Sequence, residues 1–166
     1  MVRKTAYCGL LVATAFLLSY IESIIPIPTG IPGVKLGIAN LAVFAALYIT
    51  DVKSAYIILT VRLILVAVTF GNLFSLIFSA AGGFLSLTLM VLCRKKNIFG
   101  KVGVSIAGGV SHNIAQMAVA VCVLRTPELF WYLPTLLIAG AFAGAVIGML
   151  GGLLLERFLT NSGYLF

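Results

Sequence analysis

Long apolar runs follow one another along almost the whole chain, each bounded by charged residues, proline or glycine. At about 1.5 Å per residue, a helix of about 20 residues crosses the roughly 30 Å hydrocarbon core of a bilayer. Hydrophobic residues make up 62% of the 166 residues and charged residues only 9%, which excludes an ordinary soluble domain. The pattern predicts an all-α integral membrane protein, a bundle of six transmembrane helices near residues 5–25, 34–50, 53–71, 73–93, 102–124 and 130–156.

These runs leave no room for an appended soluble domain, so we expect one membrane domain over residues 1–166. The first run follows Arg3 and Lys4, as in a secretory signal, but Glu22 closes it and no small-x-small cleavage site follows. We therefore interpret it as a retained first span. The second run is the shortest, which predicts a tilted or partly buried helix.

The basic residues are divided unevenly between the two sides of the predicted spans. One side has only Lys35 and Arg125. The other side collects Arg3, Lys4, Lys53, Arg94, Lys95, Lys96, Lys101 and Arg157. Because cytoplasmic loops carry the excess of Lys and Arg, we expect a protein of the cell membrane with both termini cytoplasmic. The net charge of +7 is mostly this inner-face excess, and no nucleic-acid partner is expected.

A stiff loop is predicted between the first two spans, in the stretch IPIPTGIPGVKLGIAN. Its prolines remove backbone donors and hold the chain extended, while its glycines permit tight turns. Non-helical backbone is stable at membrane depth only where protein buries it or where it borders a wet cavity. The path through Lys35 to Asn40 therefore suggests a cavity open to the outside. The alternative is an ordinary turn, with Lys35 reaching lipid headgroups.

Polar residues inside the predicted spans are expensive in lipid, so each should face a partner, water or a ligand. In GGVSHNIAQ, His112 and Gln116 lie one helical turn apart on one face, with Asn113 beside them. The alternatives are an ion pair of Arg62 with Glu22, and a hydrogen bond in which His112 ties two helices together. We hypothesise one outward-facing cavity for a small-molecule substrate, lined by Lys35, Asn40, Arg62, Asn72, His112, Asn113 and Gln116.

Small residues form a second pattern. In the first span, Gly9 and Ala13 make a short small-residue face that either packs inside the bundle or docks another membrane protein. In the last span, four glycines at four-residue steps predict a groove for close helix packing: Gly140, Gly144, Gly148 and Gly152.

The sequence lacks the residue patterns that enzymatic or metal chemistry requires. Prenyl transfer needs clustered carboxylates to hold Mg²⁺ on a diphosphate, whereas the four acidic residues are far apart in sequence. There is no Walker A loop, and no serine or cysteine has a recognisable base beside it. One histidine and three scattered cysteines make no metal motif. We expect no catalytic residues, no cofactor and no bound metal.

Several segments together carry a family resemblance over nearly the whole chain. They are the proline-rich loop running into PGVKLGIANL, the spans RLILVAVTFGNLFSLIFSAAGGFLSLTLMVLCRKK, and SHNIAQ. In these segments the chain resembles the substrate-binding S components of energy-coupling factor transporters. The closer resemblance is to the branch labelled Gx transporter or heptaprenyl diphosphate synthase component I. Thr50 and Asp51 depart from the Gly-Pro with which many S components end the second span.

The resemblance implies an S-component-like bundle that binds a small vitamin-like or precursor molecule from outside. It also implies partners, a membrane coupling subunit and two cytoplasmic ATPase subunits. The small-residue face that S components carry on their first helix corresponds here to Gly9 and Ala13. Two other functions stay open: an accessory membrane protein of isoprenoid or quinone metabolism, and a non-catalytic subunit of a membrane redox complex.

Overall fold

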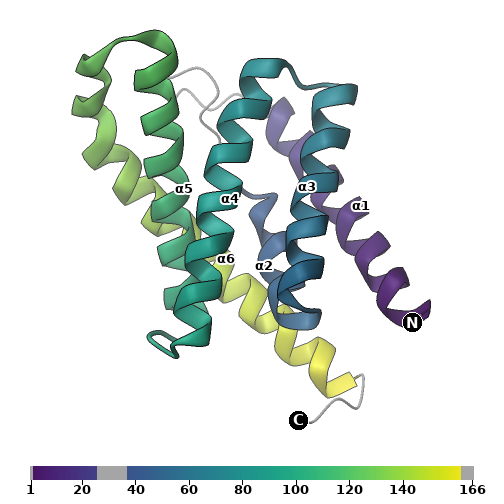
Figure 1. Cartoon of the computed structure of the whole chain (residues 1–166). Helices are drawn as coiled ribbons and strands as arrows, with labels where there is room; N and C mark the ends of the chain where they lie inside the picture. Colours follow the sequence, from purple (N-terminus) through teal and green to yellow (C-terminus); the bar gives the residue numbers. More distant parts are fainter. Residues whose placement is uncertain (1, 26–36, 162–166) are drawn as a thin grey trace.

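The computed structural model describes residues 2–25 and 37–161. The described residues fold into helices without a strand, so the prediction of an all-α bundle is confirmed (Figure 1). The predictions that involve Pro26, Pro28, Gly30, Pro32, Gly33 and Lys35 lie outside the described residues. The helices are α1 (Val2–Ile24), α2 (Asn40–Ile49), α3 (Val52–Thr69), α4 (Leu73–Lys95), α5 (Lys101–Leu124), the 3-10 helix η1 (Pro127–Tyr132) and α6 (Leu133–Asn161).

Five of these helices are long and apolar enough to cross a membrane, and α2 is not. With ten residues, α2 is about 15 Å long, half of the hydrocarbon core. The run predicted over 34–50 therefore differs from the structure, because Gly37 adopts a left-handed conformation (φ +77°) and the helix begins only at Asn40. The five long helices indicate a multi-pass membrane protein.

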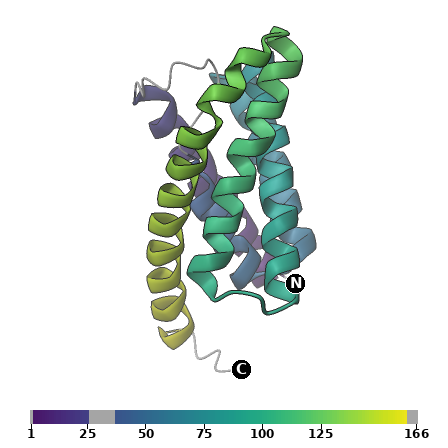
Figure 2. The ribbon, with the colours of Figure 1, turned by 90° about the vertical axis from the view of Figure 1, so that its left-hand side faces the viewer.

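The short helix α2 lies at the centre of the bundle. It contacts α1, α3, α4 and α6, and Ala42–Leu47 are all buried. Phe44 and Leu47 are fully buried in the main core cluster, which also contains Ile58, Leu87 and Leu155 from three other helices. Figure 2 shows α5 between α4 and α6, the two helices with which it packs most extensively. The polar residues of α2 and α5 are thereby brought to the middle of the molecule.

The outer surface of the bundle is apolar. Large side chains such as Val68, Ile138 and Phe142 are more than 70% exposed. A soluble protein avoids such broad apolar exposure, whereas lipid tails solvate it. The start of α1, the end of α6 and the α4–α5 connection lie toward the same end of the bundle (Figure 1).

Asp51 fastens the start of α1 to the corner between α2 and α3. Its carboxylate lies 2.6 Å from Lys4 Nζ and accepts a hydrogen bond of 2.6 Å from Ser54 Oγ. These two donors lower the pKa of Asp51 to about 2. The position that departs from the Gly-Pro of many S components is thus a polar link between helices.

The four-residue spacing predicts close packing at four glycines of α6, and three of them, Gly140, Gly144 and Gly148, lie against the backbone of α5. A Cβ added at Gly144 would lie 2.7 Å from Ile106 Cα, and one at Gly148 would lie 2.8 Å from Val102 Cα. Gly152 is different, since a Cβ there would meet nothing within 4 Å. Each four-residue step turns by about 40° around a helix of 3.6 residues per turn. The fourth glycine has therefore rotated away from α5.

Candidate functional site

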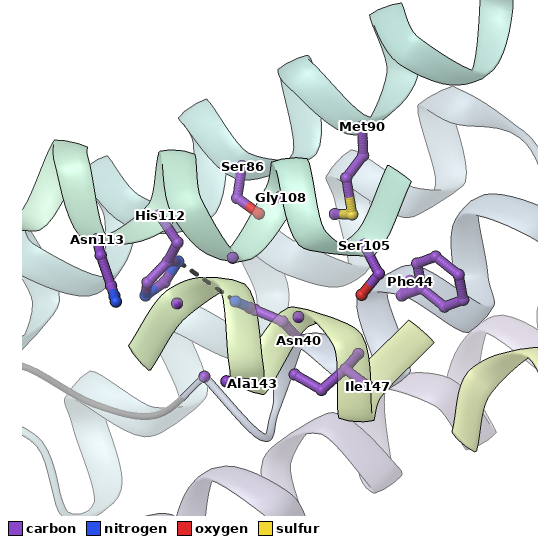
Figure 3. Close-up of a pocket in the computed structure, with 14 residues that line it drawn as sticks. Asn40, Phe44, Ser86, Met90, Ser105, Gly108, His112, Asn113, Ala143 and Ile147 are labelled. Atoms are coloured by element: carbon purple, nitrogen blue, oxygen red, sulfur yellow. Dashed lines mark hydrogen bonds between the residues drawn. The ribbon is translucent and has the colours of Figure 1, made fainter. Parts of the chain in front are cut away.

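A small cavity lies in the middle of the bundle, where α2, α4, α5 and α6 meet (Figure 3). Its volume is about 20 Å³, room for roughly one water molecule. Apolar walls come from Phe44, Met90 and Ile147. The polar side chains that line it are Asn40, Ser86, Ser105, His112 and Asn113.

Glycines on α4, α5 and α6 make room for the side chains around the cavity. A Cβ added at Gly108 would lie 2.8 Å from the Met90 side chain, and one at Gly82 would lie 2.7 Å from the His112 ring. The imidazole therefore lies directly against the backbone of α4. On the other side of α5, Gly140 leaves space for Asn113, whose Nδ2 would be 2.8 Å from an added Cβ. Larger residues at Gly82 or Gly140 would therefore displace His112 or Asn113.

Asn40 links the cavity to a second polar group deeper in the bundle. Its Nδ2 lies 3.3 Å from Nδ1 of His112, and its Oδ1 accepts a hydrogen bond of 3.3 Å from Nη1 of Arg62. Arg62 also donates from Nε to Ser19 Oγ, at 2.9 Å. The side chains of Arg62 and His112 are each only 5% exposed. A continuous hydrogen-bonded path therefore runs from α1 through α3 and α2 to α5.

The sequence offered Glu22 as an ion-pair partner of Arg62. Glu22 is 4% exposed and accepts a hydrogen bond of 2.5 Å from the backbone nitrogen of Gly37. Its charge also acts on Arg62. Glu22 thus fixes the turn that precedes α2, while the direct hydrogen bonds of Arg62 go to Ser19 and Asn40.

Asn113 and Gln116 have contrasting surroundings. Asn113 Nδ2 donates to the backbone oxygen of Leu136, at 2.7 Å, and so connects α5 to α6. Gln116 is fully buried one turn beyond His112, and neither atom of its amide has a hydrogen-bond partner in the part of the chain that the structure describes. A buried amide without a partner is costly. Gln116 therefore has hydrogen-bonding capacity to spare, although it is not part of the cavity lining.

Besides Gln116, two more predicted site residues are not brought into this cavity. Asn72 is exposed at the start of α4, where its side chain accepts a hydrogen bond of 2.7 Å from the backbone nitrogen of Ser75. That is the role of a helix N-cap. Arg62 borders a separate, smaller cavity of about 10 Å³ beside Gly71 and Ser79, and reaches the central one only through Asn40.

Ser86 and Ser105 line the cavity but were not among the residues predicted from the sequence. Both are buried, and neither hydroxyl has a hydrogen-bond partner within the described residues. Serine in a membrane helix usually bonds its own backbone, so a serine alone gives little signal. A usable signal for Ser105 is its place seven residues before His112, on the face that also carries Gly108 and Gly109.

The small-residue face of α1 points away from the bundle. Gly9 and Ala13 are exposed, and a Cβ added at Gly9 would meet nothing within 4 Å. The neighbouring residues Leu10 and Thr14 border an apolar groove of about 220 Å³ that α1 forms with α2 and α6. The sequence left open whether Gly9 and Ala13 pack inside the bundle or face outward. In the structure they face outward.

Among the described residues, no three His, Cys, Asp or Glu side chains gather closely enough to hold a metal ion. The central cavity instead presents amides, hydroxyls and an imidazole, groups that orient a small molecule by hydrogen bonds.

Comparison with known proteins places the chain in a family. No curated protein and no solved structure matches it. The model of one family, described as heptaprenyl diphosphate synthase component I, matches residues 11–154. Since this match spans most of the 166 residues, the chain belongs to the heptaprenyl diphosphate synthase component I family.

Proposed function

We propose that the chain is the substrate-binding membrane subunit of a transporter of the energy-coupling factor type, within the ABC family, and that it takes up a small vitamin-like or precursor molecule. The observation that carries this proposal is the polar lining of Asn40, His112 and Asn113 around a central cavity. Polar side chains inside a membrane bundle are costly, and ionisable ones there are by default candidates for a substrate site. The apolar outer surface keeps this polar group separate from lipid.

The chemistry of the site suits a ligand that is recognised by hydrogen bonds. Among the described residues, nothing bonds the hydroxyls of Ser86 and Ser105 or the nearby amide of Gln116. The buried guanidinium of Arg62 donates to Ser19 and Asn40 and is not part of the cavity lining. A cavity of about 20 Å³ holds roughly one water molecule, so the ligand-bound form must be wider than this closed form.

The proposed partners are a membrane coupling subunit and two ATPase subunits at the cytoplasmic side. Helices associate in a bilayer through close packing of small residues, and Gly9 and Ala13 offer such a face on the outside of α1. The α4–α5 connection, whose sequence includes basic residues such as Lys95 and Lys96, lies toward the same end of the bundle as the start of α1 (Figure 1). This distribution supports the cell membrane, with both termini cytoplasmic.

Native mass spectrometry of the protein purified in detergent tests this function. We expect a retained small molecule, whose purified form binds to the ligand-free protein and is taken up by cells only when the coupling partners are present. A protein that retains no small molecule and supports no uptake would contradict the proposal.

A second candidate follows from the description of the family. The words heptaprenyl diphosphate synthase component I favour an accessory role in isoprenoid or quinone metabolism. In that case, prenyl substrate would turn over only when a soluble synthase partner and this protein are combined. Measuring prenyl diphosphate formation with and without the membrane protein distinguishes this candidate from uptake.

A further inference from the structure

Asn40 lies between a group that can only donate hydrogen bonds and a group that can either donate or accept. On one side, Nη1 of Arg62 lies 3.3 Å from its Oδ1. On the other, Nδ1 of His112 lies 3.3 Å from its Nδ2, the contact drawn as a dashed line in Figure 3. The amide thus connects two basic side chains that are each only 5% exposed.

The direction of each hydrogen bond follows from the chemistry of these groups. A guanidinium has N–H donors and no acceptor, so the Asn40 oxygen must face Arg62 and the amide nitrogen must face the ring. An amide nitrogen is a donor, so Nδ1 of His112 must accept. In a neutral imidazole only one nitrogen accepts, and the proton is then on the other nitrogen, Nε2.

The reverse arrangement has no support in this part of the bundle. Turning the Asn40 amide over would set its nitrogen against the donors of Arg62. Two donors would then face each other, the amide nitrogen and the guanidinium, which is unfavourable for groups this deeply buried. Arg62 is itself held in place, because Ser19 accepts from its Nε and passes its own hydrogen on to the backbone oxygen of Ala15, at 2.8 Å.

We propose that Arg62 is a positioning residue which, through Asn40, fixes His112 as a neutral imidazole with its proton on Nε2. His112 then has no free acceptor, and its one donor is the N–H group at Nε2, on a ring that also makes a hydrogen bond with the Gly82 backbone. A ligand group that meets this ring must therefore accept a hydrogen bond. This last step rests on the proposed function, whereas the position of the proton does not.

The chain offers a direct measurement, because His112 is its only histidine. Protein labelled with ¹⁵N-histidine and purified with a tag that contains no histidine gives the two ring-nitrogen signals of this residue alone. We expect Nε2 to be protonated and Nδ1 to be unprotonated in the ligand-free protein at neutral pH.

Variants test whether Arg62 sets this state. Arg62→Lys retains a donor toward Asn40 and should retain the proton on Nε2. Arg62→Leu frees the amide to turn over, so a mixture of the two tautomers is expected. In Asn40→Asp the carboxylate can only accept, and a proton should appear on Nδ1. Arg94→Leu is the matched control, because Arg94 also holds α2 but donates to the Leu47 backbone oxygen, near the opposite end of the helix from Asn40.

The proposal is overturned if the native protein carries its proton on Nδ1 or on both nitrogens. It is equally overturned if Arg62→Leu leaves a single Nε2-protonated state. If Arg62→Leu does not fold, the ring-nitrogen signals of the native protein and of Asn40→Asp still test which nitrogen of His112 carries the proton. Because these signals are read without ligand, a protein that binds nothing would contradict the proposed function and leave this result unaffected.

Discussion

Gly140 of α6 lies against Gly109 of α5 so closely that a Cβ added at Gly140 would stand 2.7 Å from the Gly109 backbone oxygen. At this distance the two helix backbones touch without side chains between them. The contact brings the backbone oxygen of Leu136, one turn earlier in α6, within 2.7 Å of Asn113. Close packing and the polar site therefore depend on the same glycines.

Gly144→Ala should destabilise the protein, whereas Gly152→Ala should not. A methyl group at Gly144 would lie 2.7 Å from the Ser105 backbone oxygen, and backbone cannot move aside without separating the helices. We expect a loss of about 1 to 3 kcal/mol in unfolding free energy, as for other overpacked sites. Gly152 has open space, so its variant is the matched control. Melting followed by circular dichroism in detergent compares the two, and equal melting temperatures would contradict the prediction.

Asn113→Ala and Ser105→Ala should separate stability from ligand binding. Asn113 donates to α6, and losing an interhelical hydrogen bond in a membrane costs on the order of 1 kcal/mol. Ser105 lines the cavity and bonds no other residue in 2–25 or 37–161, so its removal should leave the melting temperature unchanged. Ser105→Ala should instead weaken the retained ligand by about 3- to 10-fold, on the order of 1 kcal/mol.

Isothermal titration and thermal melting on the same preparations provide both quantities. Thr69→Val is a suitable control, because Thr69 is exposed and bonds only the backbone of its own helix. If Ser105→Ala binds with native affinity, this hydroxyl is not part of the ligand site.

The Asp51 carboxyl should titrate near pH 2. Its pKa lies below the ordinary 3.8 chiefly because it accepts from Lys4, and secondly because it accepts from Ser54. The link from α1 to the α2–α3 corner is therefore present above about pH 4 and is lost as the pH falls toward 2. Lys4→Met should raise the midpoint toward 3.8, and Ser54→Ala should raise it less.

The carboxyl carbon shift of Asp51 measured against pH gives this midpoint. Lys53→Met removes a nearby positive charge that does not contribute to the shift and should leave the midpoint in place. Since the side chains of Lys4 and Asp51 are 58% and 45% exposed, the global melting temperature should change little. A midpoint that Lys4→Met does not move would contradict the assigned cause.

Hydropathy was sufficient to predict the long helices, because a span of about 20 apolar residues has few other stable folds. The family resemblance, based on PGVKLG and SHNIAQ, is confirmed by the family match. The beginning of α2 was not predictable in the same way. The residues of 34–39 are mostly apolar, so no loss of hydropathy marks the left-handed turn at Gly37 or its hydrogen bond with Glu22.

For the candidate site, the sequence indicated which polar residues lie in spans but not which of them meet. Asn40 and His112 are 72 positions apart, and their contact depends on how far the short helix α2 reaches into the bundle. Asn72 was also predicted to line the cavity because it is polar, yet it caps helix α4 at the surface. Ser86 and Ser105 were missed because serine is common in membrane helices without any ligand.

The last prediction concerns the outer face of α1. Gly9→Leu combined with Ala13→Leu should leave the fold and ligand binding of the isolated protein nearly unchanged. The reason is that Gly9 has open space around its Cα and Ala13 is exposed. If a coupling subunit packs on this face, two leucines would hold its backbone away, and both complex formation and uptake should be lost.

A matched control is Gly152→Leu, which also places a leucine at an open position of a long helix but on α6. Affinity, partner copurification and uptake are measured for both variants in parallel. Loss of uptake in the α1 variant alone, with native ligand affinity, would locate the contact with the coupling subunit on α1. Native affinity excludes unfolding as the cause, because an unfolded protein would not bind the ligand. Native uptake by the α1 variant would exclude this face as the docking surface, since a contact made through small residues cannot accommodate two leucines one turn apart.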